Sequence, residues 1–302
     1  MARIVFFGNE RLATGVTTTA PTLQALIANG HEVVAVVSHH EMATSRKSRE
    51  LEIAHVAQQH GIPVLLPNKP LDILEQLKSY QADIGVLVAY GKMVPQQIID
   101  AFAHGIINIH PSDLPKHRGP TPLESVIRSG ERQTAVSVMQ LVKAMDAGPV
   151  YQKTTVALTG NETKQQLADS LLKIGSEMIV ALLPDILHGS MVPKTQIETE
   201  ATFDSLIQKQ DGVIDWQQPA TQIERDIRAF AGWPKSSTQI NGIDVVVTAA
   251  RVIEQKGVAG HWSVTGKELV VYCGQGSVVL ERVIPAGKSE MDSQAFINGY
   301  MR

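Results

Sequence analysis

The residues best suited to chemistry lie in one stretch, residues 105–119, which reads GIINIHPSDLPKHRG. Asn108 and His110 stand two residues apart at the end of its apolar run. Because alternate side chains of a β-strand point to the same face, the amide and the imidazole are expected to lie side by side. Burying two polar groups at the end of a strand is costly unless they have a role. This pair is therefore the first candidate for a functional site.

A carboxylate follows about thirty residues later in the run VKAMDAG, where Asp146 lies between the strand-like stretches 135–141 and 148–156. An amide, an imidazole and a carboxylate together can catalyse acyl transfer without a covalent nucleophile. Asn108 would donate to a developing oxyanion, and a protonated His110 would do the same or pass a proton. Asp146 would hold His110 in its charged form and accept a proton from an attacking amine. Spacing alone leaves another interpretation open, in which all three side chains satisfy backbone groups in turns and loops.

The elements that must hold these residues alternate along the first half of the chain. Short apolar strands are expected at 3–8, 32–38, 82–89 and 105–109, and an extended piece at 63–66. Helical spacing of apolar residues is found at 21–29, 51–60, 71–79 and 95–103. This alternation predicts a doubly wound, mostly parallel, Rossmann-like sheet. In such sheets ligands bind beyond the carboxyl ends of the strands, which is where the candidate pair is expected.

The second half of the chain has a different pattern. A long helix is expected at 164–187, and a polar segment follows it. Glycines then separate one helix and several short strands, which predict a small β-rich, barrel-like domain of OB-like type; the helix is expected at 220–230 and the strands at 244–249, 268–273 and 277–283. We therefore expect a catalytic domain at 1–189, a linker at 190–203 and a β-barrel-like domain at 204–302.

Composition limits the class of protein. The chain has 302 residues, of which 43% are apolar and 19% charged, so a disordered chain is excluded. The net charge of −3 excludes a protein that coats nucleic acid by bulk positive charge, so any RNA contact must be local. The single Cys273 excludes an intrachain disulfide and a cysteine-rich zinc site. No apolar run suits a signal peptide or a membrane span, and we expect a cytoplasmic protein, with no requirement for assembly beyond a monomer.

Several common motifs are missing. Gly8 ends the first expected strand, but the residues after it form neither G-x-G-x-x-G nor a P-loop, which argues against a nucleotide held by a glycine loop. The absence of G-x-S-x-G weakens the hypothesis of a serine hydrolase. His39 and His40 are adjacent and would not share one face of a helix or strand, so no metal site is expected.

The run NIHPSDLPKHRG, followed by MDAG, resembles the folate-dependent formyltransferases. In that family an Asn, a His and an Asp form the catalytic set, and the formyl donor is 10-formyltetrahydrofolate. The resemblance therefore implies that Asn108, His110 and Asp146 are catalytic. The run VAYG is similar to the family segment whose backbone meets the pterin ring. The folate-binding residues that the resemblance implies are Val88, Ala89, Tyr90, Gly91, Ser112, Leu114 and Pro115.

Three features depart from the family pattern. Asp113 stands where the family usually has leucine and adds a charge near the site, and His117 stands where an aromatic residue is common. After the first strand the family usually shows glycine, a small polar residue and then Pro-Asp-Phe, whereas residues 8–12 here read GNERL. In the family that stretch neighbours the aminoacyl and catalytic pocket. The family pattern therefore does not predict how residues 8–12 of this chain contact the formyl donor or the formyl acceptor.

The second half narrows the resemblance to one branch of the family. Four short runs in order, IDW, IRAF, WP and PAGK, are similar to the branch whose members formylate methionyl-tRNA, and the similarity covers nearly the whole chain. In that branch a basic loop inserted after the second strand enters the acceptor-stem end. The corresponding run here contains Arg46, Lys47 and Arg49, which the resemblance implies are tRNA contacts. A solvated loop with scattered charge is the alternative interpretation of this run.

The second domain is less basic than a tRNA-binding domain of this family usually is. Residues 204–302 carry ten Lys or Arg and eleven Asp or Glu, a net charge of −1. Arg228 and Lys235 are the tRNA contacts expected there, within a basic face that also includes Arg225 and Arg251. Because phosphate contacts govern the salt dependence of binding, only a modest dependence is expected.

Two other functions remain. A sugar-nucleotide formyltransferase has a similar catalytic domain and a different second domain, and it would formylate a sugar amine; the basic run and the WP at 233–234 favour tRNA. A non-catalytic RNA-binding or folate-binding module of the same fold is the second alternative, and the intact Asn108, His110 and Asp146 argue against it. A glycinamide ribonucleotide formyltransferase would resemble only the first two thirds of the chain.

Overall fold

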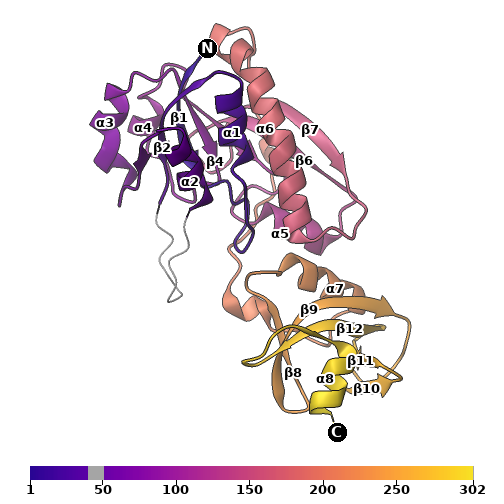
Figure 1. The fold of residues 1–302 in the computed structure, drawn as a ribbon. Coiled ribbons are helices and arrows are strands. Elements are labelled where there is room, and N and C mark those ends of the chain that lie inside the picture. The colour runs from indigo at the N-terminus through magenta and orange to yellow at the C-terminus, as the bar shows by residue number, and fades with distance from the viewer. Residues whose placement is uncertain (40–50, 302) are drawn as a thin grey trace. The chain divides into compact units, whose positions relative to one another are not determined.

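The computed structural model describes residues 1–39 and 51–301 (Figure 1). The chain divides into two compact units that do not follow chain order strictly. Unit 1 comprises Met1–Leu123, Gln133–Leu158 and Gln165–Ser205. Unit 2 comprises Glu124–Arg132, Thr159–Lys164 and Leu206–Arg302.

Unit 1 is built on a seven-stranded sheet in the order β3-β2-β1-β4-β5-β6-β7. The first five strands in that order pair in parallel, and β5, β6 and β7 pair antiparallel. The predicted doubly wound, mostly parallel sheet is confirmed. The strands are β1 (Arg3–Gly8), β2 (Glu32–Val37), β3 (Val64–Leu65), β4 (Ile84–Val88), β5 (Ile106–His110), β6 (Gln133–Gln140) and β7 (Val150–Ala157).

Helices cover both faces of this sheet, which is why its central strands are apolar throughout. Side chains of α3 and α4 share one buried cluster with Val5, Phe7 and Ile106. On the opposite face, α6 packs so closely that a Cβ at Gly175 would lie 2.6 Å from the Ile109 side chain. The helices that flank this sheet are α1 (Pro21–Ala28), α2 (Glu52–Gln59), α3 (Leu74–Ser79), α4 (Gln96–Ile99) and α6 (Lys164–His188).

The structure changes two helix predictions and adds one helix that was not predicted. The helix expected at 71–79 is a 3-10 turn, Pro70–Ile73, followed by α3, and the one expected at 95–103 is a single turn, α4. Beyond α4 the backbone bonds join residues three apart, as in Phe102 N to Ile99 O, so the chain continues in turns. The helix α5 (Pro122–Ser129) was missed, although its initial proline and amphipathic spacing are typical helix signals.

Unit 2 contains an antiparallel sheet in the order β10-β11-β12-β9-β8, with β13 paired to β12. This confirms the predicted β-rich second domain. Three of its strands, β8, β10 and β13, were not predicted, because they are too polar or too short to show alternation. The final helix was not predicted either. The elements are α7 (Ala220–Ala229), β8 (Ser236–Ile240), β9 (Ile243–Ile253), β10 (Trp262–Thr265), β11 (Glu268–Tyr272), β12 (Ser277–Pro285), β13 (Met291–Asp292) and α8 (Ser293–Tyr300).

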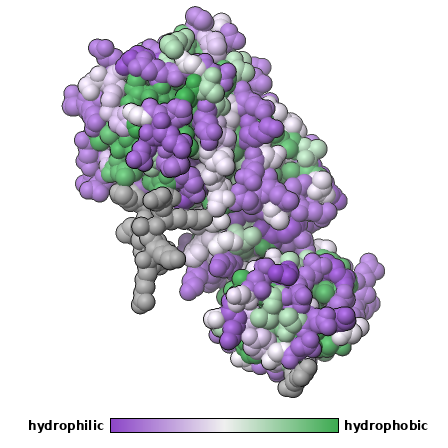
Figure 2. All heavy atoms as spheres, in the orientation of Figure 1, coloured by the Kyte–Doolittle hydropathy of each residue, from purple (hydrophilic) through white to green (hydrophobic). Residues whose placement is uncertain are grey.

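The surface is mixed in character. Figure 2 shows hydrophilic residues spread over both units with apolar residues scattered between them. Within residues 1–39 and 51–301, no helix combines the length and the apolar character needed to cross a bilayer.

A buried carboxyl holds the start of α1. Glu10 is 1% exposed, and its two carboxyl oxygens accept hydrogen bonds from the backbone N–H groups of Thr22 and Leu23 at 2.8 and 2.9 Å. These donors belong to the first turn of the helix, where backbone N–H groups lack partners within the helix. Burial raises the pKa of Glu10 to about 7, although the backbone hydrogen bonds act in the opposite direction.

This pKa shift makes stability depend on pH. Between about pH 4.5 and 7 the folded protein binds a proton at Glu10 that the unfolded chain has lost, so the contribution is complete below pH 4.5 and disappears as pH rises to 7. We predict that the free energy of unfolding of the wild type falls by about 2–3 kcal/mol more between pH 5 and pH 8 than that of Glu10→Gln, whose side chain does not titrate. Urea unfolding at several pH values checks this, and parallel curves for the two proteins would contradict it.

Candidate active site

The strand β5 presents the candidate pair at its carboxyl end. Asn108 and His110 alternate with Ile107 and Ile109, so both polar side chains lie on the face that carries Ile106. Each of the two polar residues is 5% exposed. The alternation expected from the sequence is therefore the arrangement that the fold has. The described part of the chain offers the Asn108 side-chain amide no hydrogen-bond partner, so its donors are available to a ligand.

The two nitrogens of the His110 ring have different neighbours. Nε2 lies 2.9 Å from the carbonyl oxygen of His117. Because a carbonyl only accepts, Nε2 must carry a proton and donate it. Nδ1 lies 3.7 Å from Oδ1 of Asp146, which is close enough for an ion pair and too long for a direct hydrogen bond. Proton chemistry at this ring is therefore directed to Nδ1 and the carboxylate beside it.

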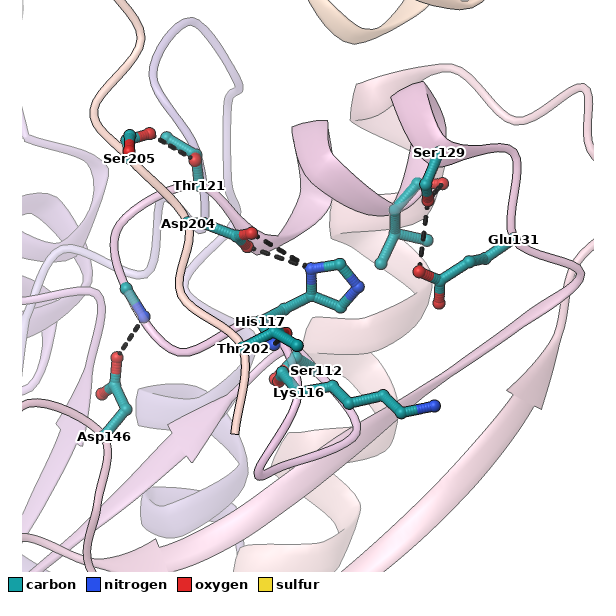
Figure 3. Close-up of polar contacts among 12 residues, drawn as sticks. Ser112, Lys116, His117, Thr121, Ser129, Glu131, Asp146, Thr202, Asp204 and Ser205 are labelled. Carbon is teal, nitrogen blue, oxygen red and sulfur yellow. Dashed lines mark hydrogen bonds and ion pairs between the residues drawn. The ribbon is translucent and has the colours of Figure 1, made fainter. Parts of the chain in front are cut away.

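Asp146 reaches His110 from a loop that begins at the other end of β5. The loop follows β6, where Leu141 N donates to Ile106 O, so the chain must return along the sheet to reach the imidazole. Oδ2 of Asp146 accepts a hydrogen bond from Gly119 N at 2.8 Å (Figure 3). One carboxyl oxygen is thus fixed by the backbone while the other faces His110. The backbone of Asp146 is left-handed, with φ 49°, a conformation that Asp tolerates better than most residues.

The segment expected to meet the pterin ring leaves the end of β4 in a sharp turn. Ala89 and Gly91 have left-handed backbone conformations, with φ 51° and 72°. The carbonyl oxygens of Val88 and Ala89 accept bonds from the backbone of residues 9 and 10. Tyr90 is 1% exposed, and its ring packs edge-on against Phe7 in the core. The Tyr90 ring is therefore part of the core, whereas Ala89 is half-buried and Gly91 is exposed.

The other residues expected to bind folate shape the loop after β5. Ser112 is fully buried, and its hydroxyl donates to Lys116 O at 2.7 Å. Leu114 is also buried, whereas Pro115 is half-buried. The extra charge expected from Asp113 is paired, because Lys153 of β7 donates to its carboxylate at 2.6 Å.

The stretch that departs from the family pattern is part of the core. All of residues 8–12 are buried. Glu10 holds the start of α1, and Arg11 donates through Nε to the Glu52 carboxylate of α2 at 3.0 Å. These two side chains therefore attach the turn after β1 to α1 and α2.

The residues expected to contact tRNA differ in how the structure accounts for them. Arg46, Lys47 and Arg49 lie outside the described residues. Arg228 donates to the Glu224 carboxylate at 2.6 and 2.9 Å, and Lys235 is exposed. Other arginines of unit 2 are also paired with carboxylates, namely Arg128 with Asp226, Arg251 with Glu268 and Arg282 with Glu290.

Comparison with known proteins identifies the family. Residues 2–183 match the formyl transferase model, and residues 206–301 match the model of the formyl transferase C-terminal domain. The methionyl-tRNA formyltransferase of Magnetococcus marinus is 34% identical over 99% of this chain and 95% of its own length. That of Methylococcus capsulatus is 33% identical over 99% of this chain and 97% of its own. The chain belongs to the methionyl-tRNA formyltransferase family. It is accordingly a formyltransferase.

Solved structures share the fold at lower identity. HypX from Aquifex aeolicus in complex with tetrahydrofolic acid has a TM-score of 0.67 and 18% identity, covering 100% of this chain and 48% of that chain. An N-formyltransferase from Helicobacter canadensis in complex with folinic acid and dTDP-3-aminofucose has a TM-score of 0.68 and 15% identity, covering 92% and 97%. Both likenesses establish the formyltransferase fold for this chain.

The buried Tyr90 hydroxyl generates a stability prediction. Within residues 1–39 and 51–301 the hydroxyl has no hydrogen-bond partner, and burial raises the pKa of Tyr90 to about 12. Tyr90→Phe removes an unsatisfied polar group, so we predict an unchanged or higher free energy of unfolding. The control is Tyr272→Phe, which removes a hydroxyl that donates to Ser263 at 3.0 Å and should cost about 1 kcal/mol. Equal losses in urea unfolding would contradict the prediction.

Proposed function

We propose that the protein transfers the formyl group of 10-formyltetrahydrofolate to the α-amino group of methionyl-tRNA. The observation that carries the proposal is the convergence of Asn108, His110 and Asp146 at the end of β5, with 3.7 Å between imidazole and carboxylate. Family membership over both halves of the chain supports tRNA as the substrate, because the relatives at 33–34% identity are methionyl-tRNA formyltransferases along nearly their whole length.

In the proposed reaction the α-amine attacks the formyl carbon directly. The new N–C bond forms, and the tetrahedral oxygen is held by the Asn108 amide and by protonated His110. The bond to N10 of the folate then breaks. The proton that the amine loses and the proton that N10 gains pass by way of Asp146 and Nδ1 of His110, since Nε2 is already bonded to His117 O. Holding two substrates together can contribute roughly 7–11 kcal/mol to the barrier reduction.

We further propose how the two substrates are held. The backbone of residues 88–91 and the loop that contains Ser112, Leu114 and Pro115 would contact the folate. The basic run with Arg46, Lys47 and Arg49, together with Arg228 and Lys235, would contact tRNA. The protein would act in the cytoplasm, in line with its one cysteine, Cys273, which is free and buried. It would act as a monomer.

A sugar-nucleotide amine is the alternative acceptor. The observation that favours this alternative is the fold shared with an N-formyltransferase solved in complex with dTDP-3-aminofucose. Initial rates with 10-formyltetrahydrofolate and either methionyl-tRNA or a dTDP-amino sugar separate the two. We expect formylation of methionyl-tRNA alone. A higher kcat/KM for the amino sugar would overturn the proposal in favour of the alternative, and no transfer to either amine would indicate a non-catalytic module.

The catalytic roles predict specific losses of rate. Asn108→Ala should lower kcat by about 100- to 1000-fold, because it removes one donor to the developing oxyanion. His110→Ala and Asp146→Asn should lower kcat at least as much. Circular dichroism and thermal unfolding establish that each variant is folded, and Asp169→Asn on the exposed side of α6 is the matched control, which should keep the wild-type rate. Near-normal turnover in any of the three variants would refute its assigned role.

The basic run predicts a separate effect on tRNA. Replacing Arg46, Lys47 and Arg49 together by alanine should raise KM for methionyl-tRNA and leave folate affinity unchanged, because phosphate contacts are lost. Replacing the exposed Lys78 and Lys173 by alanine is the charge control. Steady-state kinetics in both substrates measure the effect. A loss of folate affinity, or an equal effect of the control, would contradict the prediction that this run contacts tRNA.

A further inference from the structure

Residues 196–205, which we call the brace, run alongside the loop after β5, here called the site loop and comprising residues 111–121. Backbone hydrogen bonds join the two: Arg118 N donates to Thr202 O at 2.9 Å, and Asp204 N donates to Arg118 O at 2.8 Å. Thr202 N in turn donates to Pro115 O. Figure 3 shows Thr202, Asp204 and Ser205 of the brace beside the site loop. Most of the brace, residues 196–203, was expected to be part of a linker, yet the brace is bonded to the loop that follows His110.

The brace holds His117 at two points. The His117 ring nitrogen Nδ1 lies 3.1 and 3.2 Å from the two carboxyl oxygens of Asp204 (Figure 3). The backbone N–H of the same residue donates to the Thr202 hydroxyl at 2.8 Å. The carbonyl of His117 is the acceptor for Nε2 of His110. The brace therefore fixes the group that holds one side of the catalytic imidazole.

The brace also holds the other side of that imidazole. Gln196 donates through its side-chain amide to the carbonyl oxygens of Asp146 and Gly148, at 2.8 and 2.7 Å. These two bonds fix the returning loop that brings the Asp146 carboxylate to Nδ1. Gly119, which donates to that carboxylate, lies so close to the brace that a Cβ on it would be 2.6 Å from Asp204 O.

A buried guanidinium joins the brace to the site loop. Arg118 is 1% exposed, and it donates to Gln196 at 3.1 Å and to the Glu198 carboxylate at 3.0 Å. Its guanidinium also lies 5.7 Å from the ring centre of Phe203. Displacing the brace would leave this charge buried without its partners, which is costly. The contacts of the buried Arg118 guanidinium therefore stabilise the arrangement of the brace against the site loop.

We propose that Gln196 and Asp204 are positioning residues for formyl transfer, acting through Asp146 and His117 on the two nitrogens of His110. The proposal rests on the proposed function for its kinetic consequences. Both residues act through their contacts with His117 and Asp146 and do not touch the reacting atoms. Their effect is to keep the His110 ring at a fixed angle between a backbone carbonyl and a carboxylate, where small displacements reduce the rate strongly.

Kinetics test the proposal through pairs of variants. Asp204→Leu removes the acceptor for His117, and Gln196→Leu removes the donor to the Asp146 loop. Each should lower kcat about 10- to 100-fold and change KM for either substrate less than twofold. Asp204→Asn keeps an acceptor for His117 and should restore most of the lost rate. Thr121→Val is the matched control, because its hydroxyl contacts the brace only at Ser205 O, away from His117 and Asp146.

A measurement without turnover separates this proposal from the proposed function. In protein with 15N-labelled histidine, the Nε2 signal of His110 is assigned by its loss in His110→Gln. We expect Asp204→Leu to shift or broaden that signal, and Asp204→Asn and Thr121→Val to leave it in place. If the wild type fails to formylate methionyl-tRNA, the proposed function is wrong. The 15N spectra then test by themselves whether the brace positions the His110 ring. An unchanged signal together with an unchanged kcat in Asp204→Leu and Gln196→Leu would overturn the brace proposal.

Discussion

The hydrogen bond from His110 Nε2 to the carbonyl oxygen of His117 determines which nitrogen of the His110 ring can exchange a proton. A carbonyl oxygen has no proton to give, so Nε2 keeps its proton whether the ring is neutral or charged. Only Nδ1 can then gain or lose a proton, and it faces Asp146. A histidine free to exchange tautomers would leave the direction of proton transfer open. Here the backbone of the site loop settles it before any substrate binds.

The fold supplies this constraint by combining an apolar sheet with polar loops. The strand β5 is buried along its length, with helices packed against both faces of its sheet, so its position is set by apolar packing. The groups that flank His110 come instead from the site loop and the loop after β6. Both loops are held by hydrogen bonds, and several of these bonds join them to the polar segment 196–205. Apolar packing thus positions the strand that carries His110, and hydrogen bonds position the groups on either side of its ring.

Sequence reasoning succeeded where periodicity carries the information. The strands β1, β4 and β5 follow from their apolar runs, and the shared face of Asn108 and His110 follows from their spacing of two. The convergence of Asp146 with His110 is different: it needed the resemblance to a family, because the loop that contains Asp146 begins at the far end of β5. No local pattern indicates that the loop turns back.

Contacts between polar residues far apart in the chain left no signal in the sequence. His117 and Asp204 are 87 residues apart, and Gln196 lies in a segment whose polarity suggested a linker. The role of Glu10 was equally hidden, since the sequence showed only that residues 8–12 differ from the family pattern. Each of these side chains satisfies backbone groups or charges that become neighbours only after the chain has folded.

A single-turnover experiment with an isotope label in the formyl group of 10-formyltetrahydrofolate tests whether the methionyl amine attacks the formyl carbon directly. The protein, the labelled folate and methionyl-tRNA are mixed, quenched over time, and separated into protein, folate and aminoacyl-tRNA. Direct attack by the amine predicts that the label passes from folate to the α-amino group of the methionyl residue and is never bound to the protein. Label on the protein before it reaches tRNA, or label released only as formate, would contradict direct transfer from folate to the amine.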